Sequence, residues 1–458
     1  MSYQNNLSEL KKAMRIKDDK QKLTHVRNTK AMLLPFTSRA TERAKFKNGF
    51  SGVVGEFTRL LLGYELKHEM DKSSINEKIL KKVDVSQEDE PYFTRLINGF
   101  LFDNENQMKI FHPHMMLYLP LSKEKDVKGE KEIAHFLKDL IGDDLQEIQS
   151  VLEKDHHGHL ITNLIIDHLD NLKDKETKKK YTSKLPHIAD LLKEDLQFIV
   201  NHKEYFVENV NLFLAYYYFY YITQLTLKFN QMFNASYVNE NKMVYLLDWE
   251  GASKSRPSYK FGYQKIKHSS ASLIIHYDCQ EHLNYIFGTS GLCYPEFLDL
   301  YVNKPQNEQE EIIDAIQCWI KEYRYHLALP NIEIPNTFKE VVVTLKDSLN
   351  EGFQLGTMQG VSSRFKIPID EIGKKYFLKT RGSLGYMLNL SQDLLLLLTA
   401  VSVKNERKPL KQVFQSLEER GVFLDRHSKE AVVALYDQLN LLDKKSDSGD
   451  AQYVKPIL

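Results

Sequence analysis

An uncharged run constrains the fold of this chain more than any other stretch. No charged residue occurs between Glu208 and Lys228, which is nominally long enough to cross a bilayer. The run also contains five tyrosines, Tyr216, Tyr217, Tyr218, Tyr220 and Tyr221, whose hydroxyls would need partners in hydrocarbon. We therefore expect a central helix buried on nearly all sides, and no association with a membrane.

Composition sets the broad class. A chain of 458 residues allows about two to four domains, and Lys plus Arg equals Asp plus Glu at 62 each. Such a balance provides no global charge to hold the protein on nucleic acid or on a membrane. Three cysteines in so long a chain suit a reducing compartment. The first residues lack the apolar region of a signal peptide, and we expect a cytoplasmic protein.

The patterning predicts a mainly α, multidomain protein with short β elements in the middle and a C-terminal winged helix-turn-helix. The expected divisions are 1–128, helical with a basic start; 129–240, helical with the Tyr-rich helix; 241–385, mixed; and 386–458, the winged helix. The basic start holds twelve Lys and Arg against four acids in residues 1–50. A solvated helix face explains this excess, and a basic surface for nucleic acid is the alternative.

The winged-helix prediction depends on helix start and stop signals. Ser391 can cap a first helix, while Pro409 and Gly421 are a favoured start and stop for a second. A third helix is expected after Ser428. Two extended runs, 441–446 and 452–458, then flank a turn that contains Gly449, which is a hairpin signal. Three helices followed by a hairpin are typical of a winged helix-turn-helix.

The charges of this module leave its role open. Lysines and arginines are available for phosphate contacts, and the third helix would enter the major groove. However, Asp447 and Asp450 lie at the expected hairpin tip, and Asp437 lies on the third helix. Those acids would repel phosphate, so a protein-docking or purely structural winged helix is an equal alternative.

Candidate DNA-binding residues are the cations of the middle region and of the C-terminal module. In the middle region, basic residues alternate with Tyr259, Phe261 and Tyr263. That alternation suits a surface that stacks bases and follows a phosphate backbone, or else an edge hairpin protected by lysines. The candidates are Lys254, Arg256, Lys260, Lys374, Lys375, Lys379, Arg381, Arg407, Lys408, Lys411, Arg426, Lys429, Lys444 and Lys445.

No catalytic motif can be argued from spacing, so we expect no enzyme activity and no cofactor. Gly52 and Gly55 precede an expected helix from Glu56, but no Gly-Lys-Ser/Thr follows them to make a phosphate loop. Asp248, Glu250 and Lys254 do not have the Glu-x-Lys spacing of a metal-dependent nuclease.

Histidines and cysteines raise the question of a metal site. The ligand types of tetrahedral zinc are present in His276, Cys279, His282 and Cys293. Zinc modules usually have tighter pairs of cysteines, so a chance arrangement is favoured while metal binding stays open. The histidine cluster at 155–159 is expected to be a solvated loop.

Several stretches resemble a known family. They are 377–390, 420–430 and 445–454, with 247–250, 253–256 and 34–36 in support. Together they resemble the DptG (DndG) family of DNA phosphorothioation-dependent restriction proteins, and the C-terminal stretches are the specific ones.

The resemblance implies a non-catalytic subunit of a bacterial defence complex. In such systems one arm replaces a non-bridging phosphate oxygen with sulfur, and a restriction arm attacks DNA that lacks the mark. Partners similar to DptF and DptH would supply the ATPase or helicase-like machinery, and double-stranded DNA would be contacted through the complex. The alternatives are a free-standing winged-helix regulator and a divergent metal-dependent nuclease.

Overall fold

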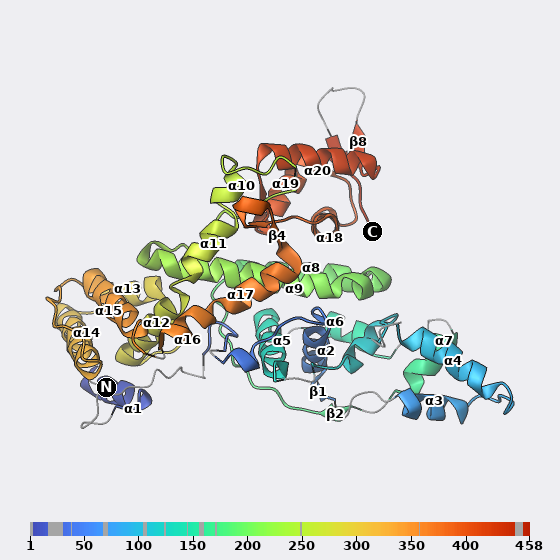
Figure 1. The fold of residues 1–458 in the computed structure, drawn as a ribbon, viewed down its shortest axis with the longest axis horizontal. Coiled ribbons are helices and arrows are strands. Elements are labelled where there is room, and N and C mark those ends of the chain that lie inside the picture. Colours follow the sequence, from blue (N-terminus) through green and yellow to red (C-terminus); the bar gives the residue numbers. More distant parts are fainter. Residues whose placement is uncertain are drawn as a thin grey trace.

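The computed structural model describes residues 3–16, 31–37, 39–66, 72–103, 108–122, 125–143, 145–154, 160–169, 172–247, 250–356, 358–444 and 452–458. These residues are mainly helical, with small two- and three-stranded sheets (Figure 1). This confirms the predicted predominance of helix. The division into four segments stays a prediction.

The elements follow one another along the chain in this order. The first half contains α1 (Tyr3–Ala13), η1 (Ala40–Glu42), α2 (Ser51–Leu62), β1 (Tyr64–Glu65), α3 (Lys72–Leu80), α4 (Glu90–Leu101), η2 (Pro113–Tyr118), α5 (Val127–Ile141), α6 (Gln146–Leu152), α7 (Leu160–Asp167), β2 (Lys173–Asp174), α8 (Pro186–Val200), α9 (Lys203–Gln231) and η3 (Met232–Asn234). The middle contains β3 (Val244–Tyr245), α10 (Pro257–Lys260), α11 (Tyr263–Ser270), α12 (Leu273–Phe287), α13 (Tyr294–Val302), α14 (Gln306–His326), α15 (Phe338–Phe353), α16 (Met358–Phe365), α17 (Ile367–Ile372), η4 (Gly373–Phe377), β4 (Leu378–Thr380), η5 (Gly382–Leu384) and β5 (Tyr386–Leu388). The last part contains α18 (Gln392–Val403), β6 (Lys408–Pro409), α19 (Leu410–Glu419), β7 (Phe423–Leu424), α20 (Arg426–Gln438), β8 (Leu442–Lys444) and β9 (Gln452–Val454).

Helix α9 lies across the centre of the molecule, as the uncharged run predicted (Figure 1). Every residue from Phe213 to Phe229 is buried, because helices from both halves of the chain, among them α2, α8, α12 and α17, pack around it. One hydrophobic core therefore runs from Leu7 to Val454, and a second, smaller core lies under α3, α4, η2 and α7. Among the described residues, no helix combines the length and apolarity that crossing a membrane requires.

The glycines before Glu56 are part of helix α2, which begins at Ser51, five residues earlier than expected. They permit close packing against neighbouring elements. A Cβ at Gly55 would lie 2.5 Å from the Leu119 carbonyl oxygen, and one at Gly52 would lie 2.5 Å from Oε2 of Glu130. The prediction missed this because close packing between distant segments leaves no local signal.

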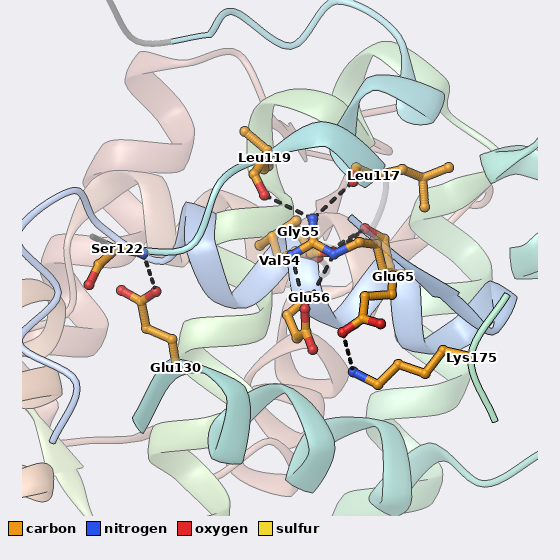
Figure 2. A network of polar contacts seen from close by, with 11 residues as sticks. Val54, Gly55, Glu56, Glu65, Leu117, Leu119, Ser122, Glu130 and Lys175 are labelled. Carbon is orange, nitrogen blue, oxygen red and sulfur yellow. Dashed lines mark hydrogen bonds and ion pairs between the residues drawn. The ribbon is translucent and has the colours of Figure 1, made fainter. Parts of the chain in front are cut away.

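A buried polar network fastens α2 to η2 (Figure 2). Arg59 is 1% exposed; its guanidinium donates to Glu56 at 3.0 and 3.2 Å and to the carbonyls of Leu117 and Leu119, both at 2.9 Å. Beside it, the Ser122 amide donates to Glu130 at 2.8 Å. These contacts satisfy an arginine that would be costly to bury alone.

The described residues of 391–458 form three helices, the short strand β7 and a three-stranded antiparallel sheet in the order β6-β9-β8. The Ser391 hydroxyl accepts from the Leu394 amide at 3.2 Å, which confirms the predicted cap of α18. The third helix starts earlier than predicted, since Asp425 caps α20 and Ser428 lies in its first turn. The expected hairpin tip at 445–451 lies outside the described residues.

The basic–aromatic stretch is helical from Pro257 onward, which corrects the alternative of an edge hairpin. Residues 257–270 form α10 and α11, and Gly262 separates them with a backbone too close to Ser258 and Val244 for a side chain. The preceding strand-like residues do pair: β3 is parallel to β7, and Leu246 forms a bridge with Asn389.

Candidate functional site

The connection between α19 and α20 is fixed to the body of the molecule at both of its ends. At one end, Arg420 donates to both carboxylate oxygens of Asp195 in α8, from Nε at 2.7 Å and from Nη2 at 2.6 Å. Asp195 is 0% exposed and also accepts from the Tyr217 hydroxyl. Burial alone would lower the pKa of the Arg420 guanidinium. The hydrogen bonds and charge of the Asp195 carboxylate outweigh this effect of burial, so the pKa of Arg420 is raised. This is a fully buried, bidentate ion pair.

A second buried pair holds the other end of the connection. Arg256 donates to Asp425 from Nε at 2.9 Å and from Nη2 at 2.6 Å, and its Nη2 is 3.1 Å from the Ser428 hydroxyl. Asp425 also accepts from the Ser428 amide at 3.0 Å and so caps α20. Burial opposes ionisation of Asp425, but its hydrogen bonds with Arg256 and Ser428 outweigh that effect and lower its pKa.

Between the two pairs the backbone itself is docked. Strand β7 pairs in parallel with β3, in the register Val244 with Phe423 and Tyr245 with Leu424. The Leu247 amide then donates to the Ser428 hydroxyl at 3.3 Å. In the first turn of α20, Ser428 is thus covered by Leu247 and Arg256, whereas Arg426 and His427 are exposed. We call residues 420–428 the anchored turn.

A shallow groove opens next to this region. It has a volume of about 620 Å³ and is lined by Ala252, Ser253, Lys254, Arg381, Gly382, Ser383 and Leu384. We call it the Ser383 groove. Its two walls come from the turn before α10 and from the loop of the β4–β5 hairpin, and Arg381 Nη2 connects them by donating to the Glu250 carbonyl at 3.2 Å.

A second groove, of about 770 Å³, lies between α19 and the sheet. Its lining is Pro409, Leu410, Lys411, Phe414, Gln415, Glu418, Lys429, Gln452 and Tyr453. Of the two lysines that line it, Lys429 is already engaged: its Nζ lies 5.2 Å from the Phe414 ring centroid and 3.1 Å from Glu418. Tyr453, also in the lining, has the Arg407 guanidinium 5.5 Å from its ring centroid.

The predicted DNA-binding residues are distributed among several environments. Lys254 and Arg381 meet in the Ser383 groove, while Lys411 and Lys429 meet in the second groove. Arg256 is 7% exposed and faces the interior, because it pairs with Asp425. The remaining positions are as follows: Lys260 over Phe261, Lys374 over Tyr386, Lys375 near the Lys47 carbonyl, Lys379 exposed on β4, Arg407 near Asp443, Lys408 bonded to the Ser402 carbonyl, and Arg426 paired with Glu430.

Some candidates cannot be placed. The backbone of Lys444 belongs to β8, but its side chain, like all of Lys445, lies outside the described residues, as does Asp248 of the nuclease alternative. Glu250 and Lys254 are exposed in the turns before α10. The histidine cluster at 155–159 and much of the basic start also lie outside the described part of the chain.

The possible zinc ligands point to different neighbours. His276, Cys279 and His282 all lie on α12. His276 Nδ1 is 3.1 Å from the Tyr294 hydroxyl, and His282 Nδ1 accepts from the Trp319 ring at 3.1 Å. Burial lowers the pKa of His276 to about 3 and raises that of Cys279 to about 12. Within the described ranges, no group of three or more His, Cys, Asp or Glu could hold a metal ion.

Sequence reasoning did not single out Asp195 and Arg420, and it assigned Arg256 to DNA. The available signal was an acid at 195 among the apolar residues of a helix whose buried face includes Leu192, Leu196 and Ile199. A charged side chain on a buried face needs a partner, but its identity, 225 positions away, cannot be read from spacing.

No protein-family model matches the chain, and no curated protein matches it significantly.

Proposed function

We propose that this chain is the non-catalytic DNA- and partner-binding subunit of a bacterial phosphorothioate-dependent restriction complex. In this proposal the complex acts in the cytoplasm against DNA that lacks the sulfur mark, and subunits similar to DptF and DptH carry out the energy-dependent and bond-breaking steps. The family resemblance provides the identity of the complex.

One spatial observation carries the proposal furthest. Among the stretches that bear the resemblance, 247–250 with 253–256, 377–390 and 420–430 are distant in sequence, but their described residues lie together in the fold. The Leu246 amide donates to the Leu388 carbonyl at 2.9 Å, Arg381 reaches the Glu250 carbonyl, and Arg256 pairs with Asp425. A family signature gathered on one part of the molecule suits a shared contact region better than scattered stabilising positions.

We further propose that residues 391–458 are a winged helix used for docking. The succession α18, β6, α19, α20, β8 and β9, with sheet order β6-β9-β8, supports that interpretation. In helix-turn-helix proteins the N-terminal residues of the recognition helix contact the bases. Here Leu247 and Arg256 contact Ser428 and so tie the corresponding turn of α20 to the body of the molecule. This arrangement favours an integrated module over a free-standing regulator that inserts α20 into the major groove.

Co-purification from the native host tests the proposal. The tagged full-length chain should retain ATPase or helicase-like subunits after the extract is digested with nuclease, because protein contacts would hold them. The proposed function is contradicted if nuclease digestion removes all co-purifying host proteins. It is also contradicted if no such subunit is found in either the digested or the undigested extract.

A further inference from the structure

The Ser383 groove brings together two segments that are far apart in sequence. Ser253 and Lys254 come from the turn before α10, and Arg381, Gly382 and Ser383 come from the β4–β5 loop. The loop is closed by backbone hydrogen bonds: the Arg381 amide donates to the Gly385 carbonyl at 2.9 Å, and the Leu384 amide donates to the Arg381 carbonyl at 2.9 Å. A tight turn of this kind holds the side chains at its tip in place.

Glycines keep this loop narrow. Gly382 and Gly385 have φ angles of +46° and +69°, which residues with a Cβ rarely adopt. A Cβ at either position would meet no other atom within 4 Å, so the backbone conformation, not crowding, calls for glycine. The result is a loop whose backbone a ligand can approach closely.

The chemistry of the groove suits an anion. Lys254 supplies an ammonium, Arg381 supplies a guanidinium, and Ser253 and Ser383 supply hydroxyls. None of the described residues that line it carries a carboxylate. Guanidinium, ammonium and hydroxyl groups are the side-chain donors that contact phosphate oxygens in protein–DNA complexes.

Further cations extend along the same hairpin. Lys379 is exposed on β4, and Lys374 Nζ lies 5.3 Å from the ring centroid of Tyr386 on β5. A single phosphate would engage the groove alone, whereas a polyanion could continue along the hairpin. The second groove is less suited to phosphate, because Glu418 lines it and pairs with Lys429.

We propose that the Ser383 groove binds the phosphate backbone of double-stranded DNA without reading its sequence. This inference deepens the proposed function, and rests on it for the identity of the polyanion. Contact with the backbone leaves base recognition and cleavage to other subunits. It also gives the chain a DNA contact that does not require α20 to enter the major groove.

The sharpest test places one charge in the groove. Ser383 is exposed, so Ser383→Asp adds a carboxylate, and Ser383→Asn is a neutral variant of matched size. Binding of the purified full-length protein to a fluorescent duplex of arbitrary sequence is measured between 50 and 200 mM salt, the range over which backbone contacts weaken steeply, by about a factor of ten or more. Ser383→Asp should weaken binding about tenfold or more, and Ser383→Asn should stay within about twofold.

Lysine variants add a second readout. Lys254→Gln should weaken binding to all duplexes alike and reduce the slope of log affinity against log salt by about one. Lys339→Gln is the control, because Lys339 is exposed on α15, is not among the candidate DNA-binding residues and does not line the groove. Equal thermal midpoints for all four variants establish that folding is unchanged.

The outcomes separate this inference from the proposed function. If Ser383→Asp and Lys254→Gln bind the duplex as tightly as the wild type, the groove is not the backbone site. The inference is also overturned if the wild-type chain does not bind the duplex on its own. Neither result bears on whether partner subunits co-purify after nuclease digestion, which tests the partner-binding part of the proposed function.

Discussion

The tyrosine hydroxyls of α9 differ in whether they find partners. Tyr217 donates to Asp195, and Tyr216 and Tyr220 donate to the carbonyls of Arg420 and Glu419. Tyr218 is equally buried, but its hydroxyl has no hydrogen-bond partner among the residues that the structure describes. A buried hydroxyl without a partner costs about 1–3 kcal/mol.

Removing these hydroxyls one at a time should therefore change stability in opposite directions. Tyr218→Phe should leave the free energy of unfolding unchanged or raise it by about 1 kcal/mol, whereas Tyr217→Phe should lower it by about 1–3 kcal/mol, since Asp195 loses a donor. Urea unfolding of both variants measures the difference. A greater loss for Tyr218→Phe than for Tyr217→Phe would refute this account of α9.

Glu130 should make stability depend on pH. Burial, together with the nearby charge of Asp126, raises its pKa to about 7, although the Ser122 amide lowers it in part. The folded protein then binds more protons than the unfolded chain between the ordinary glutamate pKa and about pH 7. This stabilisation is fully present below the unfolded pKa and is lost as pH rises through the folded one.

Glu130→Gln should abolish that dependence. The quantity to compare is the free energy of unfolding of the variant minus that of the wild type. This difference should be about 1–3 kcal/mol larger at pH 8 than at pH 4. Unfolding in urea at the two pH values provides the comparison. If the free energies of unfolding of the two proteins differ by the same amount at pH 4 and at pH 8, Glu130 does not titrate in this range.

At the scale of elements, glycines determine how closely helices approach other segments. A Cβ at Gly129 in α5 would lie 2.3 Å from the Ala44 amide nitrogen, whereas a Cβ at Gly99 in α4 would meet nothing within 4 Å. Gly129→Ala should lower stability by about 1–3 kcal/mol through overpacking against backbone. Gly99→Ala should raise it by up to about 1 kcal/mol through helix propensity. Thermal unfolding that gave both variants the same sign would contradict this packing.

Elements with strong local signals could be predicted from the sequence, and pairs between distant segments could not. The uncharged run of α9, the cap at Ser391 and the succession of C-terminal helices are local patterns, and the structure confirms them. The boundaries of α2 and α20 were wrong, because close packing at Gly55 and capping by Asp425 depend on tertiary context. Of the candidate cations, spacing could not separate Lys254, which lines a groove, from Arg256, which is buried two residues later.

At the scale of the whole molecule, the buried Arg420–Asp195 pair should decide whether residues 391–458 stay attached to the body. Asp195→Ala leaves a buried guanidinium without its partner and should cost about 3–5 kcal/mol. The adjacent Glu194 pairs with Lys404 and is 58% exposed, so Glu194→Ala should cost less than about 1 kcal/mol. Hydrogen exchange of α18–α20 should increase in Asp195→Ala alone. Equal exchange in both variants would mean that the pair does not anchor this module.

Photo-cross-linking within the assembled complex on DNA tests the central claim most directly. That claim is that this subunit meets DNA at the Ser383 groove and not through the start of α20. A photoreactive amino acid replaces either Ser383 or His427, which is exposed in the first turn of α20. The account predicts cross-links to DNA from position 383 and none from position 427. Cross-links to DNA from position 427 without any from position 383 would contradict it.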